Sequence, residues 1–151
     1  ETHGLIAAVE DQGVGVAWQA NGVAGTGSYY VETGATATAI GTGSTNTTTI
    51  IGFLEDLGEL PYAAGIARAY NGGGFNDWFL PSKIELNKMR AYRATINTTA
   101  SANGGSDFST DEYWSSTEIS LEIAFSKLFF NGNPLEYFKS TGYRVRAARA
   151  F

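Results

Sequence analysis

The stretch that decides the fold is DWFLPSKIELNKMRAY, residues 77–92. Its apolar run at 78–80 predicts the end of a buried strand, and Pro81 suits the entry into a helix. Ser82 is followed three residues later by Glu85, which is the pattern of a capping box, where two residues exchange side chain to backbone hydrogen bonds. The segment therefore predicts a strand end that passes directly into a helix.

The helix that follows Pro81 has an apolar and a basic face. Its apolar residues recur three positions apart and are predicted to face the core: Leu86, Met89 and Tyr92. At 100° per residue, Lys83 and Arg90 lie within about 20° of each other around the helix, and Arg93 lies about 60° further round. We therefore expect these three cations to form a basic stripe on the solvent side.

Upstream of this helix, the patterns predict two strands, a long loop and two further helices. Short apolar or alternating runs bounded by turn residues indicate the strands, and a segment rich in Gly, Thr, Ala and Ser indicates the loop. Threonine caps and glycine at the far ends indicate the helices. These elements are expected at 4–9 and 14–18 (strands), 19–47 (loop), from Thr47 or Thr48 to Gly58 (helix) and 63–70 (helix).

Downstream of it, the patterns predict a polar loop and then strands. The loop is expected at 98–110, and the strands at 113–116, 123–130, 135–138 and 143–151. Three further cations on or beside these strands join the basic stripe as candidate ligand contacts: Lys127, Lys139 and Arg144. Strands, then helices, then strands, without βαβ repetition, predict one α+β domain over residues 1–151 with a largely antiparallel sheet.

The composition excludes several classes of chemistry. The chain of 151 residues has no cysteine and a single histidine, His3. Disulfides, thiol nucleophiles, histidine-dependent triads and multi-histidine metal sites are therefore not expected. No stretch approaches the roughly 20 apolar residues that span a bilayer. We expect a domain that is not an enzyme, uses no cofactor or metal and does not insert into a membrane.

The net charge of −5 conceals an asymmetry along the chain. Residues 1–62 contain seven acidic residues and no Lys or Arg, whereas residues 63–151 contain all ten basic residues and eight acidic ones. One face of the folded protein could therefore attract polyanions although the whole chain is acidic. The alternative is that these cations are ordinary solvated side chains.

Four motifs resemble one bacterial family, in the order expected and over nearly the whole chain. They are HGLIAA at 3–8, DWFLPSK at 77–83, YWSST at 113–117 and RVRAARAF at 144–151. Together they resemble the domain found at the C-terminus of the Legionella collagen-like adhesin. The helix entry after Leu80 and the Trp-Ser-Ser strand are also similar to the C-type-lectin-like fold of the formylglycine-generating enzymes.

The resemblance implies the head of a secreted or surface-attached adhesin, following a collagen-like stalk outside this chain. It implies binding of sulfated glycosaminoglycans such as heparin or chondroitin sulfate, with a role in host attachment, virulence and biofilm and with no nucleic acid partner. Because collagen-like stalks contain three chains, it also implies a homotrimer, in which weak sites gain avidity. The candidate contacts for the glycan are Lys83, Arg90, Arg93, Lys127, Lys139 and Arg144.

Three other interpretations compete with this one. A structural trimerisation cap without a ligand would use the long loop at 19–47 as a subunit interface. An oxidase like the formylglycine-generating enzymes would need cysteines for copper, which this chain lacks. A calcium loop is suggested by the alternation of polar residues at 107–112, but the glycine and distant glutamate of an EF-hand loop are missing.

Overall fold

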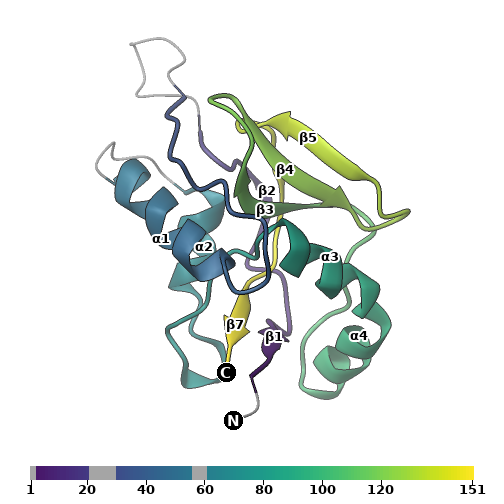
Figure 1. The fold of residues 1–151 in the computed structure, drawn as a ribbon. Coiled ribbons are helices and arrows are strands. Elements are labelled where there is room, and N and C mark those ends of the chain that lie inside the picture. Colours follow the sequence, from purple (N-terminus) through teal and green to yellow (C-terminus); the bar gives the residue numbers. More distant parts are fainter. Residues whose placement is uncertain (1–2, 21–29, 56–60) are drawn as a thin grey trace.

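The computed structural model describes residues 3–20, 30–55 and 61–151 (Figure 1). Within these residues, the elements in chain order are β1 (Leu5–Ala7), β2 (Gly13–Val16), α1 (Gly43–Leu54), α2 (Ala63–Ala69), a short 3-10 turn (Gly72–Gly74), α3 (Lys83–Ala91), α4 (Arg93–Ala102), β3 (Glu112–Glu118), β4 (Ile123–Leu128), β5 (Pro134–Phe138), β6 (Tyr143–Val145) and β7 (Ala148–Ala150). In the sequence, the helices lie between two groups of strands and do not alternate with them. The predicted α+β class is confirmed.

The strands form two sheets that are largely antiparallel. The larger sheet has the order β2-β6-β3-β4-β5, in which only the β3–β6 pair is parallel. Strands β1 and β7 form a separate antiparallel pair, and the C-terminal end of the chain lies beside this pair in Figure 1. Strand β5 is one edge of the larger sheet, and four of its five residues are exposed.

Strand β3 separates two hydrophobic clusters. Tyr113 and Trp114 are consecutive and therefore point to opposite faces of the strand. Trp114 packs in one cluster with Ile50 and Leu54 of α1, whereas Tyr113 packs in the other with Leu86 of α3. Figure 1 shows α1 and α2 on one side of the molecule and α3 and α4 on the other. Helix α3 is thus held against the sheet by its own cluster.

The predicted entry into α3 is confirmed. The hydroxyl of Ser82 accepts a hydrogen bond from the Glu85 N–H at 3.4 Å, and the Glu85 carboxylate accepts one from the Ser82 N–H at 2.7 Å. The same carboxylate accepts from the Gly41 N–H at 2.7 Å. The capping box therefore also fastens the segment that leads into α1. Leu86 and Met89 face the core, as predicted.

The prediction that Tyr92 faces the core is wrong. Helix α3 ends at Ala91, the Tyr92 backbone leaves the helical region (φ −99°, ψ 15°), and the Tyr92 side chain is 62% exposed. A new helix begins at Arg93, so Arg93 does not lie on α3. The basic stripe predicted for one straight helix is interrupted after Arg90.

Two further boundaries differ from the prediction, and both involve threonine. Helix α1 begins at Gly43 rather than at Thr47 or Thr48, and α4 extends to Ala102, inside the predicted polar loop at 98–110. The Thr47 hydroxyl does not cap a helix but donates to the Gly43 carbonyl one turn back, and the threonines of α4 do the same. Buried packing, rather than helix propensity, accounts for helices in such sequences.

The predicted last strand at 143–151 is two strands in different sheets. Strand β6 pairs with β2 and β3, and β7 pairs with β1. Between them, the buried Arg146 side chain donates to Asp11 and to the carbonyls of Ser106 and Asp107. These contacts hold the chain at the point where it passes from one sheet to the other.

The predicted long loop at 19–47 is described only in part. Residues 30–40 have no regular structure, as predicted. Residues 21–29 of the loop, and the helix end predicted at Gly58, lie outside the described residues. The described part is anchored to the sheet, because the N–H groups of Thr33 and Gly34 donate to the Glu118 carboxylate at 2.9 and 2.7 Å.

Candidate functional site

The ten basic side chains of the protein fall into two groups that differ in their partners. Four form ion pairs: Lys139 with Glu118, Arg144 with Asp11 and Asp111, Arg146 with Asp11, and Arg149 with Asp77. A fifth, Arg68, donates to the Ser44 carbonyl and the Thr48 hydroxyl. The other five, which are Lys83, Lys88, Arg90, Arg93 and Lys127, form no ion pair with a carboxylate in the described part of the chain. We call four of them the cation face: Lys83, Arg90, Arg93 and Lys127.

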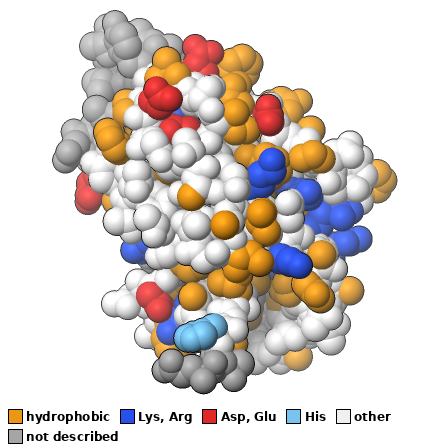
Figure 2. Space-filling view, viewed as in Figure 1, with side chains coloured by type: hydrophobic (Ala, Val, Ile, Leu, Met, Phe, Trp, Pro, Cys, Tyr) orange, Lys and Arg blue, Asp and Glu red, His pale blue; other side chains and the backbone are white. Residues whose placement is uncertain are grey.

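Three members of the cation face lie close enough to repel one another. Burial, together with repulsion from Arg90 and Lys83, lowers the pKa of Lys127. Lys83 and Arg90 come from α3 and Lys127 from β4, two elements that pack together. Figure 2 shows Lys and Arg side chains gathered on the side of the molecule where α3 lies. An anion bound among these cations would relieve their repulsion.

Contacts with the sheet hold Lys83 in place. Its ammonium lies 4.6 Å from the centre of the Phe125 ring, within the range of a cation–π interaction. Its backbone N–H donates to the Thr117 hydroxyl at 2.9 Å. Lys83 is therefore positioned by two neighbouring strands, although its charge has no carboxylate partner among the described residues.

Arg90 and Arg93 are linked through the end of α3. The Nε of Arg90 donates to the Phe129 carbonyl at 3.2 Å. Its guanidinium lies so close to Gly132, in the turn between β4 and β5, that a side chain at Gly132 would collide with it. Arg93 donates to the Arg90 carbonyl at 3.1 Å. The Arg93 guanidinium therefore lies against the Arg90 backbone at the C-terminal end of α3.

Lys139 does not join the cation face. Its side chain is fully buried, where it pairs with Glu118 at 2.5 Å, donates to the Val31 carbonyl at 3.0 Å and lies over the Trp18 ring. Burial lowers the pKa of Lys139, and the Glu118 carboxylate opposes that effect. We correct the sequence interpretation here: the charge of Lys139 belongs to the interior, where it fastens the segment at 31–34, and it does not reach an external ligand.

Arg144 is also committed to partners within the protein. It pairs with Asp11 at 3.1 Å and with Asp111 at 2.8 Å. Hydrogen bonds from Ser109 and Arg144 lower the pKa of Asp111. Since these carboxylates already neutralise Arg144, it is not free to bind a sulfate in this arrangement. The polar residues at 107–112, considered as a calcium loop, instead bind arginines; among the described residues no cluster of three or more His, Cys, Asp or Glu could hold a metal ion.

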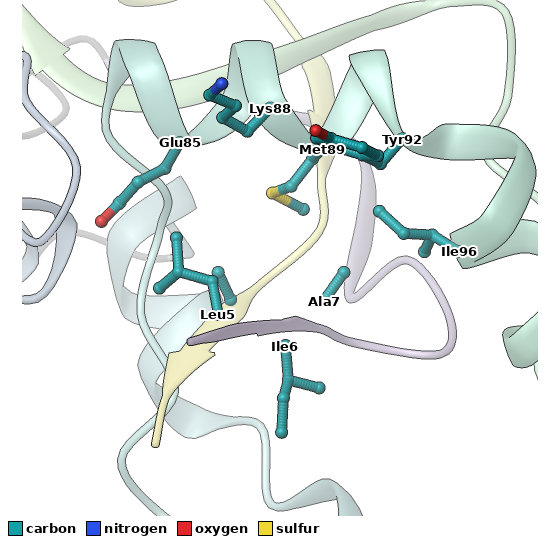
Figure 3. A pocket seen from close by; sticks show the side chains of 9 residues that line it. Leu5, Ile6, Ala7, Glu85, Lys88, Met89, Tyr92 and Ile96 are labelled. Carbon is teal, nitrogen blue, oxygen red and sulfur yellow. The ribbon is translucent and has the colours of Figure 1, made fainter. Parts of the chain in front are cut away.

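A cavity of about 240 Å³ lies between β1 and the helices α3 and α4. Figure 3 shows Met89 of α3 and Leu5 and Ala7 of β1 around it, with Lys88 and Tyr92 on the helix side. Its lining is mostly apolar, and the Glu85 carboxylate in its wall already serves the capping box. The cavity is therefore mainly an apolar surface, with Lys88 as its basic lining residue.

Lys88 also forms no ion pair with a carboxylate in the described part of the chain, but it does not belong to the cation face. It lies about 160° round α3 from Arg90 and lines the cavity instead. The sequence reasoning missed Lys88, and it also missed the exposure of Tyr92 and Phe130. Tyr92 was assigned to the core by its spacing, and the exposure of Phe130 depends on the turn that ends β4.

The match to a known family spans most of these elements. The family model described as the Lcl C-terminal domain matches residues 7–149. A comparison with curated proteins finds no match. No helix among the described residues is long and apolar enough to cross a membrane. Because the family model covers nearly the whole chain, from β1 to β7, the chain belongs to the Lcl C-terminal domain family, a family of adhesin-associated domains.

Proposed function

We propose that the cation face binds sulfated glycosaminoglycans, such as heparin or chondroitin sulfate, and that the domain is a binding module and not an enzyme. The observation that carries the proposal is the difference in ion-pair partners between the basic side chains of the cation face and the others. Most basic side chains outside the cation face are neutralised by carboxylates, whereas those of the cation face are positioned without one in the described part of the chain.

The chemistry of the cation face suits sulfate groups. The guanidinium groups of Arg90 and Arg93 offer planar pairs of N–H donors, and the lysines supply mobile point charges. Each exposed contact is weak because solvent and salt screen it. Several contacts along one polymer are therefore needed for useful affinity, and the extended cation face provides them although the whole chain carries a net charge of −5.

The first expected result is a steep dependence of heparin affinity on salt. Binding of a polyanion releases its counterions, so the logarithm of the association constant should fall linearly with the logarithm of the salt concentration. Isothermal titration at several NaCl concentrations measures that slope. With three or four cations engaged, the slope should be roughly −2 to −4. A chain that does not bind heparin even at about 20 mM salt would contradict the proposal.

We further propose that three copies assemble and that the domain acts at the bacterial surface in host attachment and biofilm. Three weak sites on one assembly multiply the affinity for a long polymer. An observation that favours assembly is the exposed apolar surface of β5, the open edge of the larger sheet, where Tyr137 and Phe138 are exposed. Open edges and exposed apolar side chains are features of subunit interfaces.

The second expected result concerns this assembly. Light scattering should give a mass of about 48 kDa, three times the 16.1 kDa of one chain. Replacing Tyr137 and Phe138 with Ser should shift the mass toward 16.1 kDa if β5 contributes to the interface. A wild-type domain that stays at 16.1 kDa at micromolar concentration is not a trimer. A stable trimer without salt-dependent heparin binding would favour a purely structural trimerisation cap.

A further inference from the structure

Strand β1 has a free edge. In an antiparallel pair, the backbone groups of successive residues point alternately toward the partner strand and away from it. On the side of β7, Gly4 and Phe151 exchange two hydrogen bonds, at 3.0 and 3.1 Å, and Ile6 is in the equivalent position two residues later. The N–H and C=O groups of Leu5 and Ala7 therefore point away from β7. No hydrogen bond joins these groups to another described residue.

The other edge of the β1–β7 pair is already covered. Ala148 of β7 lies opposite Ala7 of β1. The Ala148 N–H donates to the Phe79 carbonyl at 2.9 Å, and the Phe79 N–H donates to the Ala148 carbonyl at 2.8 Å. In the part of the chain that the structure describes, the small sheet is thus closed beside β7 and open beside β1.

The free edge lies along an apolar groove. The cavity between β1 and α3 continues into a second cavity of about 250 Å³ between β1 and α4, because Leu5–Ala7 and Ile96 line both. Ala100 of α4 lies in the far wall, and Figure 1 shows α4 on the side of β1 opposite to β7. The groove is closed at Val9, whose carbonyl accepts from the Ser106 N–H at 2.8 Å. It is therefore open only beside the three residues of β1.

Both faces of β1 offer apolar surface to a neighbouring strand. Figure 3 shows Leu5 and Ala7 directed across the cavity toward Met89, and Ile6 directed the other way. Ile6 is 42% exposed. The cavity also has a charge to offer, because Lys88 lines it and forms no ion pair with a described carboxylate. The groove therefore suits an apolar segment that carries an acidic side chain.

A single peptide strand satisfies these features better than a helix or a second copy. A helix could cover the apolar lining, but its backbone groups bond within the helix, so the groups of Leu5 and Ala7 would stay unpaired. A second copy cannot bring its own β1 to this edge, because that strand lies in the same kind of groove beside its α4. A separate extended strand has both edges free. It can pair through its main chain while alternate side chains enter the cavity.

We propose that β1 binds an extended apolar strand of a partner protein, which becomes a third strand of the β1–β7 sheet. Main-chain hydrogen bonds to Leu5 and Ala7 supply the affinity, apolar side chains fill the cavity, and a carboxylate near Lys88 sets the direction of the strand. Lys88 lies about 160° round α3 from Arg90. The groove is thus separate from the cation face, and strand binding does not depend on glycan binding.

The test uses a fluorescent hexapeptide of sequence EVAVAV with blocked ends, and fluorescence polarisation measures its binding. The peptide should bind with a Kd below about 1 mM. Amide hydrogen exchange at Leu5 and Ala7 should slow when it binds, whereas exchange at Ile6, whose N–H faces β7, should change little. Lys88→Gln should weaken binding about threefold by removing the charge. The matched control is Lys83→Gln, on the cation face, which should not change it.

Ala7→Pro tests the free edge itself. It removes an N–H that points away from β7, and proline is tolerated at such positions of edge strands. Peptide binding should weaken at least about tenfold, because a hydrogen bond is lost and the proline ring blocks the edge, while thermal unfolding changes little. The mass from light scattering should stay the same as that of the wild type. A mass that falls in Ala7→Pro would overturn the proposal in favour of a second copy at this edge.

N-methylated peptides test the pairing without altering the domain. Methyl groups on the third and fifth residues of the peptide, or on the second and fourth, block opposite edges of the strand. One of these two peptides should lose binding and the other should keep it. If both bind as well as the parent peptide, or if exchange at Leu5 and Ala7 does not slow, the peptide is not paired with β1 and the proposal is wrong. A wild-type domain that does not bind the parent peptide at about 1 mM also contradicts it.

Discussion

Replacing Lys83, Arg90 and Lys127 together with Gln is expected to reduce heparin affinity at least about a hundredfold. Each charge-assisted contact at an exposed site contributes roughly 1 kcal/mol, and three of them correspond to two orders of magnitude in affinity. These three residues are chosen because the structure brings them within electrostatic reach of one another. Glutamine keeps part of the aliphatic stems while removing the charges, including the cation–π contact of Lys83 with Phe125.

The measurement is titration with heparin, accompanied by a urea or thermal unfolding curve. Stability should change little, because surface substitutions away from buried networks usually have small effects. Arg68→Gln is a matched control for Arg90→Gln, since Arg68 also lacks a carboxylate partner among the described residues but lies on α2. Arg90→Gln should weaken heparin binding and Arg68→Gln should not. Full affinity in the triple variant would place the site elsewhere on the protein.

Lys139→Met is expected to destabilise the fold by about 3–5 kcal/mol, because it leaves the Glu118 carboxylate buried without its ammonium partner. The side chains of both residues are almost completely inaccessible to water. A buried charge that loses its partner cannot recover its hydration, whereas an exposed pair loses little. Urea unfolding measures the change, and the midpoint of thermal unfolding should fall by roughly 10 °C for a domain of this size.

The matched control is the double variant Lys139→Met with Glu118→Gln. It removes both charges but leaves only one acceptor oxygen for the Thr33 and Gly34 N–H groups, so it should recover part of the lost stability. Hydrogen exchange should show the largest loss of protection at Thr33 and Gly34 in the single variant. A single variant as stable as the wild type would show that the pair contributes nothing to the fold. Neither variant should alter heparin binding at a temperature where the protein is folded, because Lys139 lies outside the cation face.

Some of the fold could be predicted because its signals are local. The capping box at Ser82 and Glu85 is a contact between residues three apart, so its pattern and its structure coincide. The core positions of Leu86 and Met89 follow from helical periodicity within a single turn. The class of fold follows from the order of elements, and the family follows from motifs spread along the chain.

Errors arose where a distant contact decides the local structure. Helix α1 is rich in threonine, and its packing against other elements through Ile50 and Leu54, rather than propensity, explains why it forms. The last strand divides because Arg146 is drawn to Asp11, 135 residues earlier in the chain. Tyr92 has the spacing of a core residue, but the chain turns at that point into a second helix.

By itself, the sequence determined the class of fold, the entry into α3, the family and the presence of cations in the second half of the chain, because composition, motifs and contacts between near neighbours carry that information. Only the tertiary structure decided which cations are available. From the sequence alone, Lys127, Lys139 and Arg144 are all expected to be exposed basic side chains. The fold places a carboxylate against Lys139 and Arg144 and repelling cations near Lys127. Whether a basic side chain can reach a ligand depends on charged residues that are distant from it in the sequence. These residues come close to it only when the sheet and α3 are packed.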